Sequence, residues 1–411
     1  MNDLDRAAAR ARQLTEKKFP GDPGVGDLLA VAANRETARD ERAAALRLLG
    51  ALVGEALVGP RIVHLDIVGA CNSNCIYCRD HSPYINDREP WRAMEMPYEL
   101  AARLIDEAVA LGAEIIPVVG AGENLLHSRF FDLVNLLKTK PLRFEVFTNG
   151  LDWDDAAIDL FAEADNALVA FSLSACTAET WAAFRPEAAP ESFARIERTM
   201  RRLIARRRAG MKVAVVHVLN KLNVREVLPL VRHAIDLGAD ELQFKLTEIN
   251  EAARSLKLDA PEIESIRLEL REARRLAALA GVDIHDNIEF QLEHLDPETG
   301  LYTVGLYDEL PCHAGFEMIR VRRDGQISFC CGLKFLSDAR EVSLAEHWLG
   351  DEMRACRAAA LAMPRGANRR LPDGGLLRDP QCDYCYNYIL NVHAQRRAQA
   401  AGAARLLPGK A

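Results

Sequence analysis

Short apolar strands alternate with amphipathic helices over most of the chain, and this alternation limits the fold more than any other feature. Helical spacing of apolar residues fills the intervals; one such helix is expected to open near Pro97 and end at Gly112. Alternation of this kind indicates parallel strands joined by right-handed crossovers. Six or seven units predict an α/β fold with a partial (β/α)6 TIM-like barrel, whose chemistry lies at the carboxyl ends of the strands. The candidate strands are 62–68, 114–119, 144–147, 168–173, 213–219, 242–246 and 282–285.

The two ends of the sequence have a different texture. Residues 1–57 are rich in Ala and Arg and predict helices with a break at 20–24. After about residue 300 the alternation stops, and 301–305 and 318–330 predict short strands and turns. We therefore expect four regions: an N-terminal helical extension at 1–57, a barrel at 58–300, a small C-terminal domain at 301–395 and a tail at 396–411.

Composition and charge narrow the class of protein. The 411 residues carry a formal net charge of −8, which disfavours nucleic acid and anionic membranes as partners. No stretch approaches the roughly 18 apolar residues of a membrane span, and the charged N-terminus lacks the apolar core of a secretory signal. These observations predict a cytoplasmic protein, in which thiols stay reduced. The ten cysteines then indicate metal ligands rather than disulfides.

Three cysteines follow the first predicted strand directly. Cys71, Cys75 and Cys78 form a C-x3-C-x2-C motif at the carboxyl end of that strand. Thiolates suit soft metals and iron–sulfur clusters, and three of them can occupy three corners of one 4Fe–4S cube. The fourth iron is then open to substrate. The alternative is a zinc site, but structural zinc takes four ligands, and the nearest further candidate is His81.

This motif resembles that of the radical SAM superfamily. In that family the three cysteines hold a 4Fe–4S cluster, and S-adenosylmethionine (SAM) binds the open iron. The reduced cluster cleaves SAM into a 5′-deoxyadenosyl radical that abstracts hydrogen from substrate. The resemblance implies that Tyr77, just before the last cysteine, packs near the adenine of SAM.

Three further motifs of the family can be located in order along the chain. Its Gly-Gly-Glu-Pro motif, which binds the SAM amino group, matches at Gly122 and Glu123 but departs at Ala121 and Asn124. The Thr-Asn-Gly that commonly ends the third strand matches around Asn149. Its Ser-x-Asp contact to SAM matches at Ser172, whereas a serine stands in place of the acid at 174. The resemblance covers about 61–290 and implies SAM-binding roles for these residues.

A second cysteine group lies beyond the predicted barrel. Cys312 and Cys330 form C-x12-G-x4-C through Gly325, and Cys382 and Cys385 form C-x2-C. Spacing alone fits a four-cysteine zinc site and an iron–sulfur cluster equally. In the company of a radical SAM barrel, the arrangement resembles the SPASM/twitch subfamily. No cysteine follows Cys385, so the resemblance implies the short twitch form with one auxiliary 4Fe–4S cluster.

Several other cysteines and polar residues lie outside these motifs. Cys331 could exchange with Cys330 as a ligand, or Cys331 or Cys176 could donate a hydrogen, whereas burial as a small residue is the simpler interpretation, also for Cys356. The arginine-rich run at 195–208 predicts a solvated helix face. Because side chains alternate between the two faces of a strand, some strand residues could face SAM or substrate. An alcohol oxidation would also need a general base. The residues considered for these roles are His217, Lys245, Thr247, Glu248, His127 and His285.

The expected function is therefore radical chemistry on a small polar substrate. Twitch relatives act on aminocyclitols, sugars and similar metabolites, which implies oxidation, epimerisation or dehydration, with an oxidoreductase favoured. An electron donor such as flavodoxin or ferredoxin is the expected protein partner. One alternative is a maturase of ribosomally made peptides, although the helical segment 1–57 does not predict the strand-containing leader-binding unit such enzymes often carry. The other is a zinc-stapled binding protein without catalysis.

Overall fold

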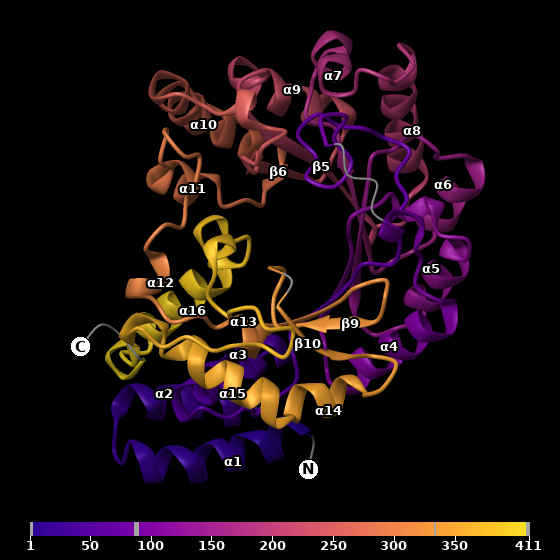
Figure 1. Cartoon of the computed structure of the whole chain (residues 1–411). Coiled ribbons are helices and arrows are strands. Elements are labelled where there is room, and N and C mark those ends of the chain that lie inside the picture. Colours follow the sequence, from indigo (N-terminus) through magenta and orange to yellow (C-terminus); the bar gives the residue numbers. More distant parts are fainter. Residues whose placement is uncertain (1–2, 86–89, 333, 408–411) are drawn as a thin grey trace. The chain divides into compact units, whose positions relative to one another are not determined.

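The computed structural model describes residues 3–85, 90–332 and 334–407. Its chain divides into two units (Figure 1). The barrel unit comprises Leu65–Ala102 and Pro117–Tyr302. The terminal unit comprises Met1–His64, Arg103–Ile116 and Thr303–Ala411, so it joins both ends of the sequence. The four predicted regions remain a prediction, and the N-terminal helices share a unit with the C-terminal segment.

Seven parallel strands neighbour one another in the order β1 to β7, and β3 to β7 lie wholly in the barrel unit. Consecutive registers are parallel; Phe147 pairs with Ala170, which pairs with Ala214. The order does not close on itself within the described residues, as expected for a partial barrel. The α/β class and parallel core predicted from the alternation are thus confirmed. The strands are β1 (Ile62–Leu65), β2 (Ile115–Val118), β3 (Arg143–Thr148), β4 (Ala167–Ser172), β5 (Lys212–Leu219), β6 (Glu241–Leu246) and β7 (Asp283–Ile284).

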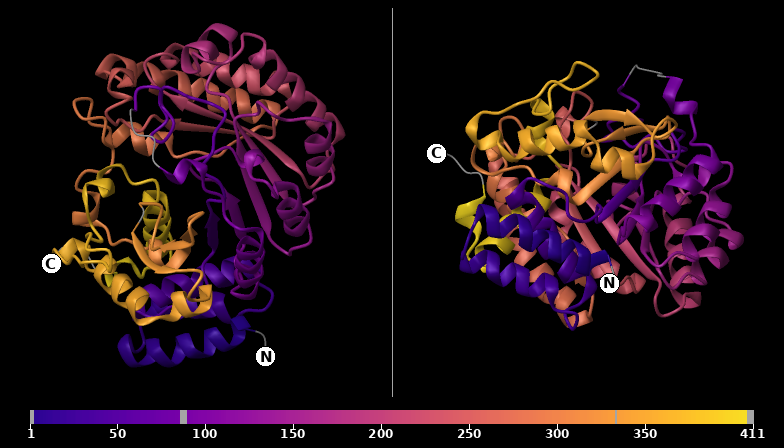
Figure 2. Two further views of the ribbon diagram at one scale, coloured as in Figure 1. Left: turned by 45° about the vertical axis from the view of Figure 1, so that its right-hand side comes forward. Right: turned by 90° about the horizontal axis from the view of Figure 1, so that it is seen from below.

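Helices follow the strands and cover one face of the sheet (Figures 1 and 2). Their ends match local sequence signals: the Asp154 side chain accepts a hydrogen bond from Ala157 N–H at the start of α6, and Asp259 and Glu262 form a capping box at α10. The helices are α4 (Tyr98–Ala110), α5 (Phe130–Lys138), α6 (Asp155–Ala162), α7 (Ala178–Phe184), α8 (Ser192–Arg206), α9 (Val227–Leu237), α10 (Ala260–Ala280) and α11 (Ile288–His294).

The two faces of the sheet bury different side chains. On the helix side, Phe144 lies with its ring centroid 6.3 Å from that of Phe161 on α6. On the opposite side, Leu168, Ala170, Ala214 and Val216 form a separate apolar cluster against which Phe147 packs. Since neighbouring strand residues point to opposite faces, register decides which side chains can reach each face.

The terminal unit packs three N-terminal helices against the end of the chain. Their core includes Leu46 and Leu49 and is completed by Ala398 and Ala403 near the C-terminus (Figure 2). The approach is close, since a Cβ on Gly24 would lie 2.4 Å from the Ala401 carbonyl oxygen. The helices of this unit are α1 (Asp3–Lys18), α2 (Pro23–Ala33), α3 (Arg39–Val53), α12 (Leu306–Glu309), α13 (Ala314–Glu317), α14 (Leu344–Leu349), α15 (Asp351–Leu361) and α16 (Tyr388–Ala400).

An antiparallel meander follows α13. It consists of β8 (Met318–Val321), β9 (Gln326–Ser328) and β10 (Phe335–Asp338), with Gly325 at φ +84° in the predicted hairpin turn. The strand expected at 301–305 is wrong: Leu306 N–H bonds to Thr303 O, and Gly305 at φ +74° turns the chain into α12. No helix among the described residues combines the length and apolar character of a membrane span. The cytoplasmic location stays a prediction.

Candidate functional site

The C-x3-C-x2-C loop leaves the carboxyl end of β1 and folds into tight turns. Cys78 N–H donates to Cys75 O over 2.9 Å, and Ser82 Oγ donates to Ile76 O over 2.9 Å. Backbone amides then point at sulfur: His81 N lies 3.2 Å and Asp80 N 3.4 Å from Cys78 Sγ. Amide donors around a cysteine sulfur are typical of thiolates that bind iron. All three cysteines are partly exposed.

The three sulfurs lie within electrostatic range of one another. Burial, followed by the charge of Glu123 and of the other two thiols, raises the pKa of Cys71 to about 12. Burial and the neighbouring Cys75 raise the pKa of Cys78 to about 12. Such thiols are protonated near neutral pH unless a positively charged group joins them. A cationic iron–sulfur cluster, which binds thiolates, fits this donor set.

Residues from the ends of β2 and β3 close on the cysteine loop. A Cβ on Gly122 would lie 2.2 Å from Ala70 O, so only glycine allows this approach. Glu123 N–H bonds to Ala70 O, and the buried Glu123 carboxylate accepts hydrogen bonds from Thr148 Oγ1 and Asn149 N, each over 2.7 Å. Burial raises the pKa of Glu123 to about 7 despite these bonds.

Asparagine side chains tie the strand ends together. Asn149 Nδ2 donates to Asn72 Oδ1 over 2.7 Å and lies 4.0 Å from Cys71 Sγ. Asn124, which stands where the family has proline, donates from Nδ2 to Val118 O and to Phe147 O. Asn124 thus bridges β2 and β3, which accounts for that departure. The structure brings Cys71, Glu123 and Asn149 together, and their roles toward SAM remain predictions.

Tyr77 is half-buried and packs against α7. Its ring meets Phe184 edge-on with centroids 5.4 Å apart, and its hydroxyl lies 3.1 Å from Ser174 Oγ. Ser174 has φ +61° and is the single non-glycine residue with positive φ in the described part of the chain. Its Oγ also accepts from Val218 N–H over 3.2 Å. Serine therefore replaces the family's acid at a strained, fully hydrogen-bonded position next to Ser172 at the end of β4.

Arg185 is a site residue that the sequence analysis missed. It is fully buried just after α7 and donates to Ser172 O over 2.6 Å and to Leu173 O over 3.3 Å. Burial lowers the pKa of Arg185, but the nearby Cys75, Tyr77 and Cys71 raise it, and the net shift is upward. A buried cation beside the thiols favours anionic sulfur or a bound carboxylate. The sequence feature that could have drawn attention to Arg185 is its position just after a helix and directly before Pro186.

Several residues considered as bases or ligands have other roles in the structure. His127 is buried with both ring nitrogens used: Nε2 lies 2.7 Å from Met96 O, and Nδ1 accepts from Arg129 N–H. These backbone partners argue against the suggested role as general base, which stays untested. Glu248 lies 3.6 Å from the Arg79 guanidinium, and His285 is exposed beyond β7. Cys176 Sγ donates to Glu226 over 3.6 Å.

Strand register separates His217 from Lys245. His217 pairs in register with Phe244 and packs against its ring. It also interacts electrostatically with His233 on α9, so it faces the helices rather than the barrel interior. Burial lowers its pKa to about 3. Lys245 points to the opposite face, with Nζ 5.0 Å from the Phe147 ring centroid. Of this pair, Lys245 is the one on the interior face.

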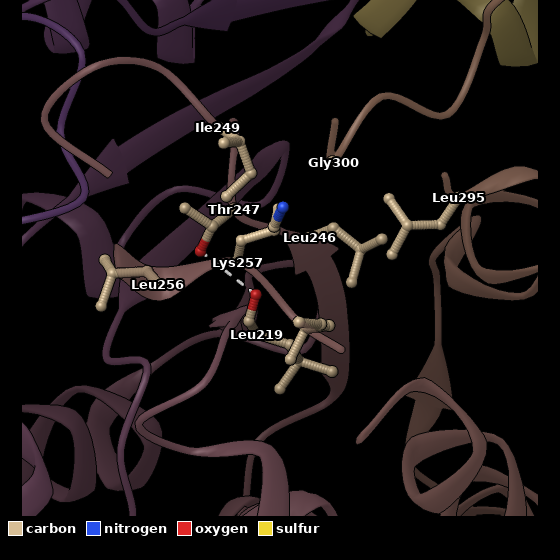
Figure 3. Close-up of a pocket in the computed structure, with 9 residues that line it drawn as sticks. Leu219, Leu246, Thr247, Ile249, Leu256, Lys257, Leu295 and Gly300 are labelled. Carbon is tan, nitrogen blue, oxygen red and sulfur yellow. Dashed lines mark hydrogen bonds between the residues drawn. The ribbon is translucent and has the colours of Figure 1, made fainter. Parts of the chain in front are cut away.

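A small, mainly apolar pocket lies beyond the ends of β5 and β6 (Figure 3). Leu219, Leu246 and Ile249 line it, and Thr247 Oγ1 donates to Leu219 O over 3.1 Å beside it. This bond satisfies the Thr247 hydroxyl as a cap between neighbouring strand ends. None of the cysteines lines this pocket.

The terminal unit gathers the second cysteine group. Burial raises the pKa of Cys312 and of Cys330. Electrostatic repulsion from Cys385 raises the pKa of both thiols further. Cys382 and Cys331 in turn raise the pKa of Cys385 by electrostatic repulsion. The four predicted ligands thus lie near one another, with Cys331 beside them. Cys356 is buried on α15, and its pKa is set by burial, Glu352 and Arg369 instead.

Among the described residues, no three His, Cys, Asp or Glu side chains are grouped to hold a single metal ion. Thiolates that hold an iron–sulfur cube bind different irons, so they need not converge on one point. The donor chemistry in each unit, three and four thiols with amide and hydroxyl donors, fits a cluster.

Comparison with known proteins gives these thiols a family context. Residues 65–234 match the radical SAM superfamily. The chain is 27% identical over 180 residues to an AdoMet-dependent heme synthase of Methanosarcina barkeri, covering 44% of this chain and 48% of that protein. It is 27% identical over 212 residues to the sporulation killing factor maturation protein SkfB of Bacillus subtilis, covering 51% and 48%. The chain thus spans about half the length of these relatives.

Solved structures match over a larger share of the chain. Streptococcus suis SuiB bound to S-adenosylmethionine superposes with a TM-score of 0.61 at 14% identity, over 87% of this chain and 84% of that one. AnSMEcpe with bound AdoMet gives 0.53 at 16% identity, over 84% and 98%. Matches this broad cannot be confined to the barrel unit. A radical SAM domain uses a 4Fe–4S cluster and SAM, and SPASM/twitch relatives carry auxiliary clusters. The resemblance found in the sequence is confirmed: this chain contains a radical SAM domain, in a fold shared with SPASM/twitch-type structures.

Proposed function

We propose that this chain is a radical SAM enzyme in which Cys71, Cys75 and Cys78 hold the SAM-binding 4Fe–4S cluster. The carrying observation is the convergence of this loop with Glu123 and Asn149 at the ends of β2 and β3. When bound, the cluster and SAM supply a 5′-deoxyadenosyl radical. The chain orients Cys78 through the Asp80 and His81 amides, and Glu123 offers a buried acceptor to an amino group.

In the terminal unit, Cys312, Cys330, Cys382 and Cys385 hold one auxiliary 4Fe–4S cluster. The electrostatic interactions of Cys312 and Cys330 with Cys385, and of Cys385 with Cys382, support this assignment, since four thiolates saturate a cube. Cys331 is the nearest alternative ligand, because it lies beside Cys330 and Cys385. Cys356 belongs to a different environment on α15.

The substrate is a peptide or a small polar molecule, and separate observations favour each. Peptide modification is supported by SkfB, named a maturation protein, and by SuiB, whose structure bound to precursor peptide SuiA has a TM-score of 0.59. A small polar substrate is supported by helices α1–α3, which show no strand-containing leader-binding unit at 3–53. We place the peptide first, because the fold match covers most of the chain. Oxidation with a flavodoxin- or ferredoxin-like electron donor is the reaction we propose.

Metal content tests the core of the proposal. The full chain, reconstituted anaerobically, should hold about eight irons, and the Cys71/Cys75/Cys78→Ala variant about four. The variant should also lose reductive cleavage of SAM to 5′-deoxyadenosine. Bound zinc without iron in the wild-type chain would refute the radical function and leave the zinc-stapled alternative.

Deuterium transfer distinguishes the substrate classes. The enzyme is incubated with SAM, reductant and deuterated cell extract, divided into peptide and small-metabolite fractions. The fraction that places deuterium in 5′-deoxyadenosine contains the substrate, because the radical takes its hydrogen there. Cys356→Ala, outside both thiol groups, is the matched control and should transfer deuterium normally.

A further inference from the structure

A tyrosine hydroxyl points at one of the proposed auxiliary-cluster ligands. Tyr307 on α12 is 2% exposed, and its Oη lies 3.0 Å from Cys385 Sγ. Asn391 on α16, 1% exposed, places Nδ2 2.9 Å from the same Oη. All three residues belong to the terminal unit.

The neighbouring groups fix where the tyrosine proton goes. The His313 backbone N–H, a donor only, lies 2.5 Å from Asn391 Oδ1, so the amide oxygen must face it. The Asn391 nitrogen therefore faces Tyr307 and donates to its oxygen. A hydroxyl has one proton, and here it is left to donate to Cys385 Sγ. The resulting chain of donors runs from His313 through Asn391 and Tyr307 to Cys385.

We propose, resting on the auxiliary cluster of the proposed function, that Tyr307 is a positioning residue that raises the reduction potential of that cluster through its hydrogen bond to Cys385. A donor to a ligand sulfur draws electron density from it and so favours the more negative, reduced state of a cluster. Asn391 holds the hydroxyl in the donating orientation.

The ligand turn itself does not depend on Tyr307. Thr303 Oγ1 donates to Cys382 O over 2.8 Å and accepts from Cys385 N–H over 2.9 Å. Thr303 N–H also donates to Asp383 O. Removing the Tyr307 hydroxyl should therefore leave the Cys382–Cys385 backbone in place, which makes Tyr307→Phe a clean perturbation.

The test isolates the auxiliary cluster in the full-length chain. Cys71, Cys75 and Cys78 are replaced by alanine, the protein is reconstituted anaerobically, iron is counted, and the cluster is titrated by electron paramagnetic resonance at controlled potentials. Adding Tyr307→Phe should make reduction roughly tenfold less favourable, a shift of about 59 mV to more negative potential for one electron. Asn391→Leu should shift the midpoint in the same direction. Tyr98→Phe, which removes a hydroxyl from α4, should leave it unchanged.

The outcomes separate this inference from the function beneath it. If the parent variant retains about four irons and Tyr307→Phe does not move the midpoint, the inference is overturned while the cluster stands. If Tyr307→Phe does not retain iron, Asn391→Leu decides, and an unmoved midpoint there overturns it equally. If the parent variant binds no iron, the auxiliary cluster of the proposed function fails, and the inference fails with it.

Discussion

Glu123 should make the metal-free chain less stable as the pH rises. Its carboxylate is 3% exposed, and burial raises its pKa from 4.5 to about 7 even though Thr148 and Asn149 donate to it. Between these two pH values the folded chain keeps a proton that the unfolded chain has already lost. The free energy of unfolding therefore falls across this window. The difference between 4.5 and about 7, at 1.36 kcal/mol per pH unit, corresponds to about 3 kcal/mol.

Glu123→Gln removes this titration. The amide stays neutral at every pH, but its NH2 group must face one of the two donors, which costs about 1 kcal/mol. At pH 5 wild type has already lost about 1 kcal/mol to this titration, which offsets the amide penalty, so the variant should be about as stable as wild type there; at pH 8 it should be more stable by about 2 kcal/mol. The stability advantage of the variant thus grows from about zero to about 2 kcal/mol between these pH values.

Urea unfolding of the metal-free, reduced chain from pH 5 to 8.5 measures this difference. Other titrating groups cancel between wild type and variant. Glu95→Gln is the matched control: two hydrogen bonds from Ser128 oppose its burial and lower the pKa of Glu95, so its effect should be constant across this range. A difference between wild type and Glu123→Gln that does not change with pH would refute the assignment of a raised pKa to Glu123.

Three further substitutions test other parts of the barrel unit. Ser174→Ala removes bonds to Tyr77 and Val218 at a positive φ and should lower the unfolding free energy by about 1–3 kcal/mol, measured by urea unfolding. His217→Leu should stabilise the chain most below pH 6.5. The buried imidazole has a pKa of about 3 and stays neutral in the folded state, whereas the unfolded state binds a proton below pH 6.5; a stabilisation that does not change with pH would contradict this. His127→Ala should lower the melting temperature yet keep SAM cleavage per folded molecule, whereas a selective loss of cleavage would show that His127 acts at the SAM site and not only in packing.

The fold class and the positions of the cysteine motifs could be predicted from the sequence, because both depend on the residue pattern within short segments. All seven predicted barrel strands match strands of the structure, since buried parallel strands need continuous apolar runs. The strand expected at 301–305 failed because its few apolar residues lack a partner strand, and Gly305 favours a turn. A short run with mixed polarity cannot be assigned without knowing what it pairs with.

The roles of residues that act through tertiary contacts could not be predicted from the sequence. Arg185 looks like one of many arginines near α8, and only the fold shows that it is buried beside Cys75 while the 195–208 run supplies ion pairs such as Arg201 with Asp236. His217 and Lys245 sit in equally apolar strands, and register alone sends them to opposite faces. Tyr307 and Asn391 meet across 84 residues of sequence, a separation that no local motif encodes.

Under the proposed ligand assignment, each unit carries all the protein ligands of its own cluster, so the two clusters should assemble independently. Cys71, Cys75 and Cys78 belong to the barrel unit, whereas Cys312, Cys330, Cys382 and Cys385 belong to the terminal unit. Within each set burial raises the pKa of thiols, so metal binding must displace protons there and stabilise that unit. Loading of one set does not require ligands from the other. Replacing the four terminal cysteines by alanine should therefore leave about four irons bound and SAM cleavage without substrate intact, while loss of all iron would show that the two sites assemble as one.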